Sequence, residues 1–176
     1  KDIINLCEEK NIPHTTIPDK IMKAISDTKT PSGLLGISKF TPPPELNLNA
    51  KRWLYLYKIS DPGNLGTILR SAAWFNIKNI ALSKDSTDPY SPKTIRSATG
   101  AHLYLNIYQN IDYKIYLGHD YFLLGTDQNS DDKIEKSAYK KKIVLFLGNE
   151  SEGIKVSIKK KMDKLISIER LGYGES

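Results

Sequence analysis

Hydrophobic and polar positions in the first 40 residues follow the periods of two short helices and two short strands. Helices are predicted over residues 1–7 and from Asp19 onward, and strands over NIPHTTI (residues 11–17) and LLGISKF (residues 34–40). The turn residues TPSG end the second helix. The helical residues expected to face inward are Ile3, Ile4, Cys7, Ile21, Met22 and Ile25.

A proline-rich segment, TPPPELNLNAK (residues 41–51), interrupts this pattern. It carries three consecutive prolines and no apolar period, as is typical of a linker. We therefore expect one domain in residues 1–38, a linker in residues 39–51 and a second domain in residues 52–176.

Beyond the linker, strand patterns alternate with helical ones. Six strands are predicted, over residues 52–59, 79–83, 103–108, 121–127, 142–148 and 164–168. Helices are expected after the first, the second and the fifth of them. Such alternation favours βαβ units, and hence an α/β fold with a mostly parallel sheet and helices on both faces. Ligands bind beyond the carboxyl ends of such strands, so chemistry is expected in the loops after RWLYLYKI, KIVLFLG and KLISI.

The composition narrows the class of protein. Lysine and arginine number 26 against 20 acidic residues, which gives a net charge of +6 and favours a polyanionic partner such as RNA. A single cysteine excludes an internal disulfide framework, and His14, His102 and His119 lack ligand spacing, so no metal site is expected. No apolar run is long enough to span a membrane, which predicts a cytoplasmic or organellar-matrix protein that is not secreted.

The loop DPGNLGTILR sets Asn64 and Arg70 at the start of a helix. In a purely structural interpretation, Asp61 or Asn64 caps the helix and Gly63 permits a tight turn. That interpretation leaves Arg70 unexplained among small and apolar neighbours. A guanidinium beside a helix N-terminus is suited to binding phosphate.

The loop LGNESEGI places Glu150 and Glu152 between Gly148 and Gly153, after an apolar strand. The glycines allow a sharp turn and the acids can cap the following helix, which is the structural interpretation. Neither nucleotide-binding glycine pattern is present, so this is not a phosphate cradle. An acidic, tight loop is better suited to hydrogen bonding with an amine, an amide or a hydroxyl.

A short predicted helix, SPKTIRSATGA, carries Lys93, Arg96 and Thr99 near one face. This face either contacts a nucleic-acid backbone or is simply solvated. Tyr104 and Tyr108 alternate as strand residues do, which predicts packing in the core rather than stacking on bases.

The three loops together resemble the SpoU (TrmH-like) family of RNA ribose 2′-O-methyltransferases, within the SPOUT superfamily. DPGNLGTILRSA resembles the first family motif, LFLGNESEGI the second, and ISIERLGYGES the beginning of the third. The resemblance covers residues 52–176, and residues 1–38 resemble the end of the L30e-like RNA-binding domain that often precedes the catalytic domain.

The resemblance implies a SPOUT fold with a C-terminal trefoil knot, S-adenosylmethionine as cofactor, and a homodimer with its active site across the interface. The third motif and the helix that completes the knot are expected to continue beyond Ser176, so residues 1–176 alone are expected to bind cofactor poorly. Glu169 stands where the family usually has proline, which could alter the knot loop.

The resemblance also implies roles for individual residues. The residues expected in catalysis are Asn64, Arg70, Glu150 and Ser176, those expected at the cofactor are Leu147, Gly148, Gly153 and Ile168, and those expected on RNA are Lys93, Arg96 and Thr99. In the family the arginine is credited with taking the proton of the ribose hydroxyl. Because arginine is almost always protonated, the alternative is that Arg70 holds phosphate and stabilises the alkoxide.

The predicted function is methylation of ribose 2′-hydroxyls, with large-subunit ribosomal RNA as the substrate because of residues 1–38. The alternatives are the same reaction on tRNA, or an RNA-binding or ribosome-assembly protein that keeps the fold without catalysis.

Overall fold

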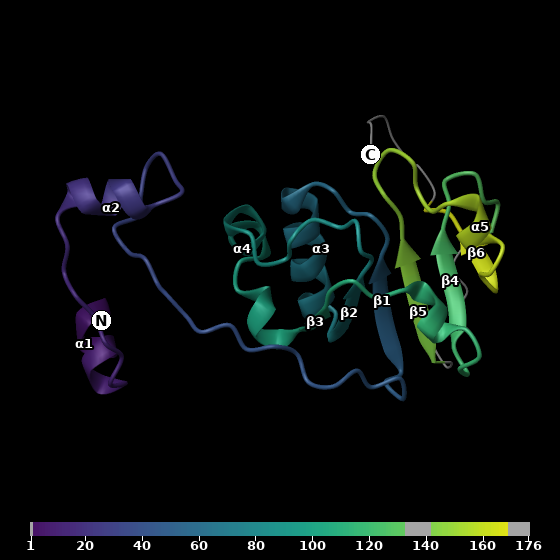
Figure 1. The fold of residues 1–176 in the computed structure, drawn as a ribbon, viewed down its shortest axis with the longest axis horizontal. Coiled ribbons are helices and arrows are strands. Elements are labelled where there is room, and N and C mark those ends of the chain that lie inside the picture. The colour runs from purple at the N-terminus through teal and green to yellow at the C-terminus, as the bar shows by residue number, and fades with distance from the viewer. Residues whose placement is uncertain (1, 133–141, 169–176) are drawn as a thin grey trace. The chain divides into compact units, whose positions relative to one another are not determined.

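The computed structural model describes residues 2–132 and 142–168 (Figure 1). The chain divides into two compact units, residues 1–41 and residues 42–176. The first unit contains the helices α1 (Ile3–Glu9) and α2 (Asp19–Ile25). Asp2 caps α1, because its carboxylate accepts the backbone N–H of Ile4 at 3.2 Å.

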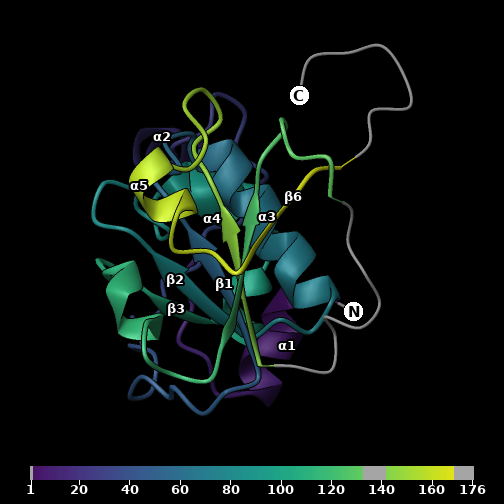
Figure 2. The ribbon, with the colours of Figure 1, turned by 90° about the vertical axis from the view of Figure 1, so that its right-hand side faces the viewer.

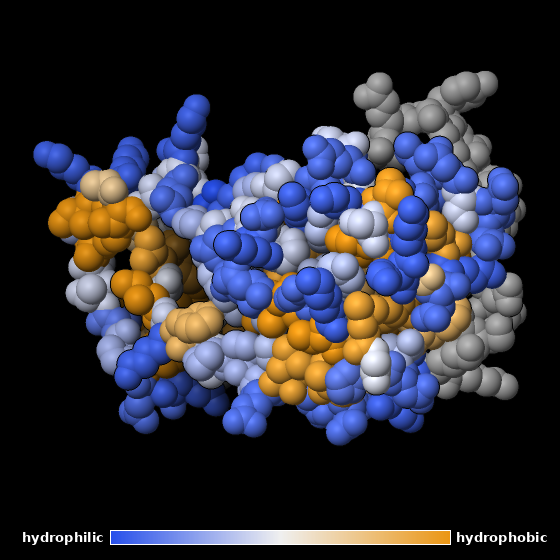
Figure 3. Space-filling model, turned by 45° about the vertical axis from the view of Figure 1, so that its right-hand side comes forward, coloured by the Kyte–Doolittle hydropathy of each residue, from blue (hydrophilic) through white to orange (hydrophobic). Residues whose placement is uncertain are grey.

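Two expectations for the first unit are wrong. Residues 11–17 and 34–40 do not form strands. A strand needs a neighbour to complete its backbone hydrogen bonds, and the strand pairs of the described residues include neither segment. The helical residues expected to face inward are not buried: Ile3, Ile4, Ile21 and Ile25 are exposed, and Cys7 and Met22 are half-buried. Figure 3 accordingly shows hydrophobic side chains at the surface of this unit.

The second unit is built on a six-stranded parallel sheet with the order β3-β2-β1-β5-β4-β6. The strands are β1 (Arg52–Leu56), β2 (Asn79–Leu82), β3 (Asn106–Tyr108), β4 (Phe122–Thr126), β5 (Ile143–Leu147) and β6 (Lys164–Ile166). The helices that follow β1, β2 and β5 are α3 (Pro62–Trp74), α4 (Pro92–Ala98) and α5 (Val156–Lys159). The 3-10 helices before and after β3 are η1 (Ala101–Tyr104) and η2 (Tyr113–Tyr116). The predicted α/β fold with a parallel sheet is confirmed.

Alternating side chains give the sheet two hydrophobic faces. On one face, Leu54 of β1 belongs to a core that includes Leu69 of α3. On the other face, Tyr55 of β1 packs with Phe146 of β5 and Tyr116 of η2, with the rings of Tyr55 and Phe146 centred 4.8 Å apart. Figure 2 shows α3 and η2 on opposite sides of the sheet.

Helices α3 and α4 approach each other closely at Gly66. A Cβ on Gly66 would lie 2.5 Å from Ser97 Cβ and 2.7 Å from the Thr94 carbonyl oxygen, so only glycine permits this approach. Ser97 Oγ also donates a hydrogen bond to the Gly63 carbonyl at 2.8 Å. The crossing therefore fixes α4 to the first turn of α3.

The connectivity of the sheet reverses between β1 and β5. Strands β1, β2 and β3 run outward in one direction, while β4 and β6 lie beyond β5 in the other. The two central strands end together, because Leu56 pairs with Leu147 and the Tyr57 N–H donates to the Leu147 carbonyl at 2.8 Å. Ligands of open α/β sheets bind at such a reversal, beyond the carboxyl ends of the strands.

The strand predicted over residues 103–108 is shorter than expected. It begins only at Asn106, because Thr99 and Gly100 adopt left-handed φ angles of 51° and 83° and the chain then turns through η1. Tyr104 therefore lies on η1 and is 71% exposed, so the prediction that it packs in the core is wrong. Tyr108 lies in β3 and is buried, as predicted.

No helix in residues 2–132 or 142–168 is long and apolar enough to cross a bilayer. The same residues contain no group of three or more His, Cys, Asp or Glu side chains that could hold a metal ion. Glu169, Ser176 and the expected knot segment lie outside the described residues.

Candidate functional site

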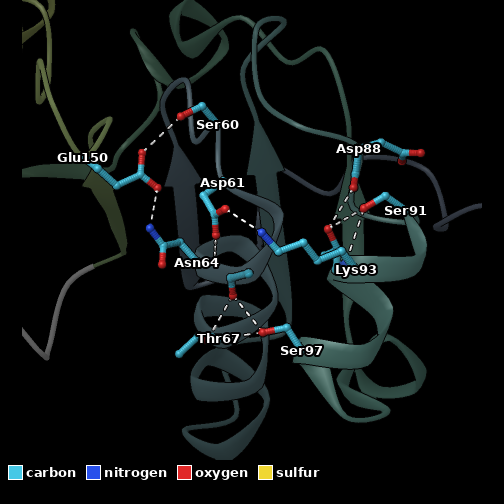
Figure 4. A network of polar contacts seen from close by, with 11 residues as sticks. Ser60, Asp61, Asn64, Thr67, Asp88, Ser91, Lys93, Ser97 and Glu150 are labelled. Carbon is cyan, nitrogen blue, oxygen red and sulfur yellow. Dashed lines mark hydrogen bonds and ion pairs between the residues drawn. The ribbon is translucent and has the colours of Figure 1, made fainter. Parts of the chain in front are cut away.

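A side-chain pair joins the loops that follow the two central strands. Asn64, in the first turn of α3, donates from Nδ2 to Oε1 of Glu150 at 3.0 Å (Figure 4). The second carboxylate oxygen of Glu150 accepts a longer bond of 3.5 Å from Ser60 Oγ. The strand order thus brings together Asn64 and Glu150, which lie 86 residues apart in the sequence.

This pair also fixes the orientation of the Asn64 amide. The assignment of its nitrogen and oxygen follows from the hydrogen bond, since a carboxylate can only accept. The Asn64 Nδ2 therefore faces Glu150, and its Oδ1 has no hydrogen-bond partner among the described residues. The site accordingly offers an amide oxygen that can accept a hydrogen bond from a hydroxyl of a bound molecule.

Asp61, rather than Asn64, caps helix α3. Its Oδ1 accepts the backbone N–H of Asn64 at 2.8 Å, and Pro62 occupies the first helical position, where the missing N–H is not needed. Lys93 of α4 donates to Asp61 Oδ2 at 2.9 Å. The pKa of the Asp61 carboxyl therefore lies below its usual value, chiefly through the Lys93 hydrogen bond and next through the Asn64 N–H. The cap leaves the Asn64 side chain available for Glu150.

The loop after β5 is held by its own backbone and by Asn149. A Cβ on Gly148 would lie 2.4 Å from the carbonyl carbon of Gly153, so the two glycines close the loop tightly. Asn149 Oδ1 accepts the N–H groups of Ser151 and Glu152 at 2.8 and 3.1 Å. Sequence reasoning missed Asn149, although asparagine's tendency to bond a backbone N–H two residues on was a usable signal.

Asn149 also connects this loop to the loop after β1. Its Nδ2 donates to the Lys58 carbonyl at 2.8 Å, and Lys58 itself adopts a positive φ of 54°. The two central loops are thus joined by the Asn149 side chain on the Lys58 backbone and by the Glu150 side chain on the Asn64 side chain.

The residues expected at the cofactor lie at the carboxyl edge of the sheet. Leu147 ends β5, Gly148 and Gly153 frame the next loop, and Ile168 follows β6 by two residues. Ile168 is 85% exposed.

Arg70 does not join the Asn64–Glu150 pair. It lies six residues further along α3, a rise of about 9 Å at 1.5 Å per residue. Its guanidinium is exposed and makes no hydrogen bond or ion pair within residues 2–132 and 142–168. It lines a groove instead.

The three residues expected on RNA occupy different surroundings. Lys93 pairs with Asp61, as described above. Arg96 is exposed, and its side chain makes no hydrogen bond or ion pair with another described residue. Thr99 ends α4 in a left-handed conformation and lines the same groove as Arg70.

Comparison with known proteins gives a family match over most of the second unit. The model of the SpoU rRNA Methylase family matches residues 51–176. Mitochondrial rRNA methyltransferase 3 of Mus musculus is 37% identical over 105 residues, which cover 56% of this chain and 25% of that protein. The 23S rRNA (guanosine(2553)-2'-O)-methyltransferase RlmP of Bacillus subtilis is 25% identical over 179 residues, covering 96% of this chain and 68% of that protein. The chain thus spans about a quarter of the mouse protein and about two thirds of the Bacillus protein.

Solved structures show the same fold. An rRNA methyltransferase from Sinorhizobium meliloti superposes with a TM-score of 0.71 at 25% identity, over 87% of this chain and 62% of that one. The SpoU methyltransferase AviRb of Streptomyces viridochromogenes, in complex with AdoMet, gives a TM-score of 0.62 at 25% identity, over 70% of this chain and 50% of that one.

Proposed function

This chain belongs to the SpoU rRNA methylase family, and from that premise we propose that it takes part in methyl transfer from S-adenosylmethionine to ribose 2′-hydroxyls of ribosomal RNA. The observation that carries the proposal is the Asn64–Glu150 hydrogen bond at the reversal of the sheet. It joins the first and second motifs of the sequence at the position where α/β sheets bind their ligands.

Asn64 positions the ribose. Its Oδ1 accepts a hydrogen bond from the 2′-hydroxyl, because Glu150 holds the amide with the nitrogen turned away. Orientation of the hydroxyl oxygen toward the methyl carbon turns an encounter of two reactants into a step within one complex. Ser60, which also contacts Glu150, helps to hold the carboxylate in place.

Arg70 binds the RNA phosphate next to the target ribose and stabilises the alkoxide that develops on the 2′-oxygen. A guanidinium stays protonated in proteins, so Arg70 acts as a fixed positive charge rather than as the base, and the proton of the 2′-hydroxyl passes to water. Ribose and phosphate alternate along RNA, so neighbouring groups of one strand reach Asn64 and Arg70 on the same helix.

S-adenosylmethionine would be held by Leu147, Gly148, Gly153 and Ile168, and it supplies an electrophilic methyl group on a sulfonium. The tight turn from Gly148 to Gly153 keeps the backbone of this loop rigid. Rigid loops preserve the alignment on which an in-line transfer depends.

The substrate class and compartment follow the relatives. Two of them are named as ribosomal RNA methyltransferases, one from mitochondria and one from a bacterium, so ribosomal RNA in the cytoplasm or an organellar matrix is the proposed setting. The family resemblance also supports a homodimer, which light scattering of the purified protein would test.

The test is transfer of labelled methyl groups by the full-length protein to unmodified ribosomal RNA and, separately, to tRNA. A 2′-O-methyl group blocks alkaline cleavage at its own nucleotide, so label should appear in alkali-resistant dinucleotides. Arg70→Ala should lower the rate by about a hundredfold, the usual effect of removing a group that stabilises developing charge. Lys84→Ala, which removes an exposed charge elsewhere, should not.

The outcomes separate the candidate functions. Label on ribosomal RNA alone supports the proposal, and label on tRNA alone would replace the substrate. Cofactor and RNA binding without transfer would favour a catalytically silent RNA-binding protein.

A further inference from the structure

A groove of about 860 Å³ lies between the C-terminal half of α3 and the turn that leads from α4 through η1. The residues of this α3–η1 groove include Arg70, Trp74, Lys78, Ala98, Gly100 and Tyr104. Its volume lies within the range of small-molecule sites. It contains Arg70 and does not contain Asn64 or Glu150.

Two aromatic side chains stand exposed in this groove. Trp74 projects from α3 with 84% of its surface exposed, and Tyr104 belongs to η1 with 71% exposed. The residues between these elements are small, with Ala98 and Ala101 buried and Gly100 beside them. The groove therefore combines exposed aromatic rings with a lining that leaves room for a flat ring.

The charges of the groove have one sign. Arg70 and Lys78 line it, and no aspartate or glutamate does. Within residues 2–132 and 142–168, neither cation makes a hydrogen bond or ion pair through its side chain. Two uncompensated cations beside exposed aromatic rings match the chemistry of single-stranded nucleic acid, which presents phosphates and the faces of unpaired bases.

We infer that the α3–η1 groove binds unpaired nucleotides of the RNA substrate, with bases stacked on Trp74 and Tyr104 and backbone phosphates at Arg70 and Lys78. This inference rests on the proposed function, because it extends the RNA path from the phosphate at Arg70. It adds a substrate class: the target lies in a loop, bulge or end, since a base inside a duplex cannot present its face to a side chain.

A polyanion suits the α3–η1 groove, because its phosphates compensate the charges of Arg70 and Lys78.

The inference is tested by the affinity of the full-length protein for a fluorescently labelled single-stranded uridine dodecamer and for a duplex of the same length. Trp74→Ala and Tyr104→Ala should each weaken binding of the single strand by about tenfold, within the range for loss of one stacked base. Duplex binding should change little. Phe75→Ala is the matched control, because Phe75 is an exposed aromatic at the end of α3 that does not line the groove.

Tryptophan fluorescence gives an independent measurement. Trp53 is buried with 1% exposed, whereas Trp74 is open to a stacked base. The single strand should therefore quench emission of the wild-type protein, and the quenching should be lost in Trp74→Phe. Quenching retained in Trp74→Phe would contradict stacking at this position.

Failure of the inference can be told apart from failure of the proposed function. If the wild type transfers methyl groups but Trp74→Ala and Tyr104→Ala bind the single strand as tightly as the wild type, the inference about the groove is wrong and the proposed function stands. If the single strand quenches Trp74 emission but no methyl group is transferred, the proposed function is wrong and RNA binding in the α3–η1 groove stands. Loss of dimer in light scattering of Trp74→Ala and Phe75→Ala alike would assign the surface to a second copy and overturn the inference.

Discussion

Gly148→Ala should disrupt the candidate cofactor loop through a backbone clash. The added Cβ would lie 2.4 Å from the Gly153 carbonyl carbon, 2.5 Å from the Ile154 nitrogen and 2.8 Å from the Gly153 Cα. Ordinary contacts of a Cβ begin at 3.4 Å, so the facing backbone must move by about 1 Å. All three atoms belong to the main chain, and no side-chain rotation can relieve the clash.

The size of the effect follows from that displacement. Overpacking of this kind costs about 1–3 kcal/mol of folding stability, which corresponds to a fall in melting temperature of roughly 3–10 °C for a chain of this size. A 1 Å misplacement near reacting groups lowers the rate by about a hundredfold. Both effects are expected in Gly148→Ala, because the displaced backbone is continuous with Asn149 and Glu150.

Thermal unfolding and the rate of methyl transfer by the full-length protein measure the two consequences separately. Gly36→Ala is the matched control, since a Cβ there meets nothing within 4 Å and its φ is not in the left-handed region. A Gly148→Ala protein with the transfer rate and melting temperature of the wild type would refute the close approach of the two glycines.

Two further predictions concern the polar contacts of the site. Glu150→Gln should lower the rate constant of methyl transfer by about tenfold or more with little change in the Michaelis constant for RNA, because it weakens a charged hydrogen bond that orients Asn64; Glu152→Gln, in the same loop, is the control. Lys93→Met should raise the pKa of Asp61 toward its usual value while leaving it still somewhat depressed, because the Asn64 N–H still donates to this carboxylate. A carboxylate with a depressed pKa stabilises the folded protein at pH values above its unfolded-state pKa, and this stabilisation is lost as the pH falls through its folded-state pKa. Lys93→Met should therefore begin to lose the contribution of Asp61 at a higher pH than the wild type. Carbon-13 NMR titration of the Asp61 carboxyl in both proteins measures the two pKa values.

The sheet of the second unit could be predicted because its strands are apolar on both sides. Residues 53–57 and 143–147 are continuous apolar runs, as expected for strands covered by helices on both faces. The strands predicted over residues 11–17 and 34–40 do not form, because pairing depends on a neighbour that a local pattern does not specify.

Tyr104 shows a second limit of local patterns. Its spacing from Tyr108 matches a strand, but the left-handed residues Thr99 and Gly100 delay the strand until Asn106. The aromatic side chain consequently lies on η1 at the surface. The groove with Trp74 follows from this turn, and no periodicity in the sequence indicates it.

The Asn64–Glu150 contact depends on strand order rather than on spacing. The sequence identifies both loops and places each after a buried strand, but β1 and β5 could be neighbours or lie at opposite edges of a parallel sheet. The order β3-β2-β1-β5-β4-β6 makes them neighbours, and their parallel pairing brings their carboxyl ends together. Helix α3 then needs Asp61 as its cap, because an Asn64 Oδ1 that accepted a helix N–H could not also accept a hydrogen bond from the substrate. The Asp and the Asn of DPGN therefore do different work: Asp61 completes the helix, and Asn64 is left to connect two loops and present its oxygen to the substrate.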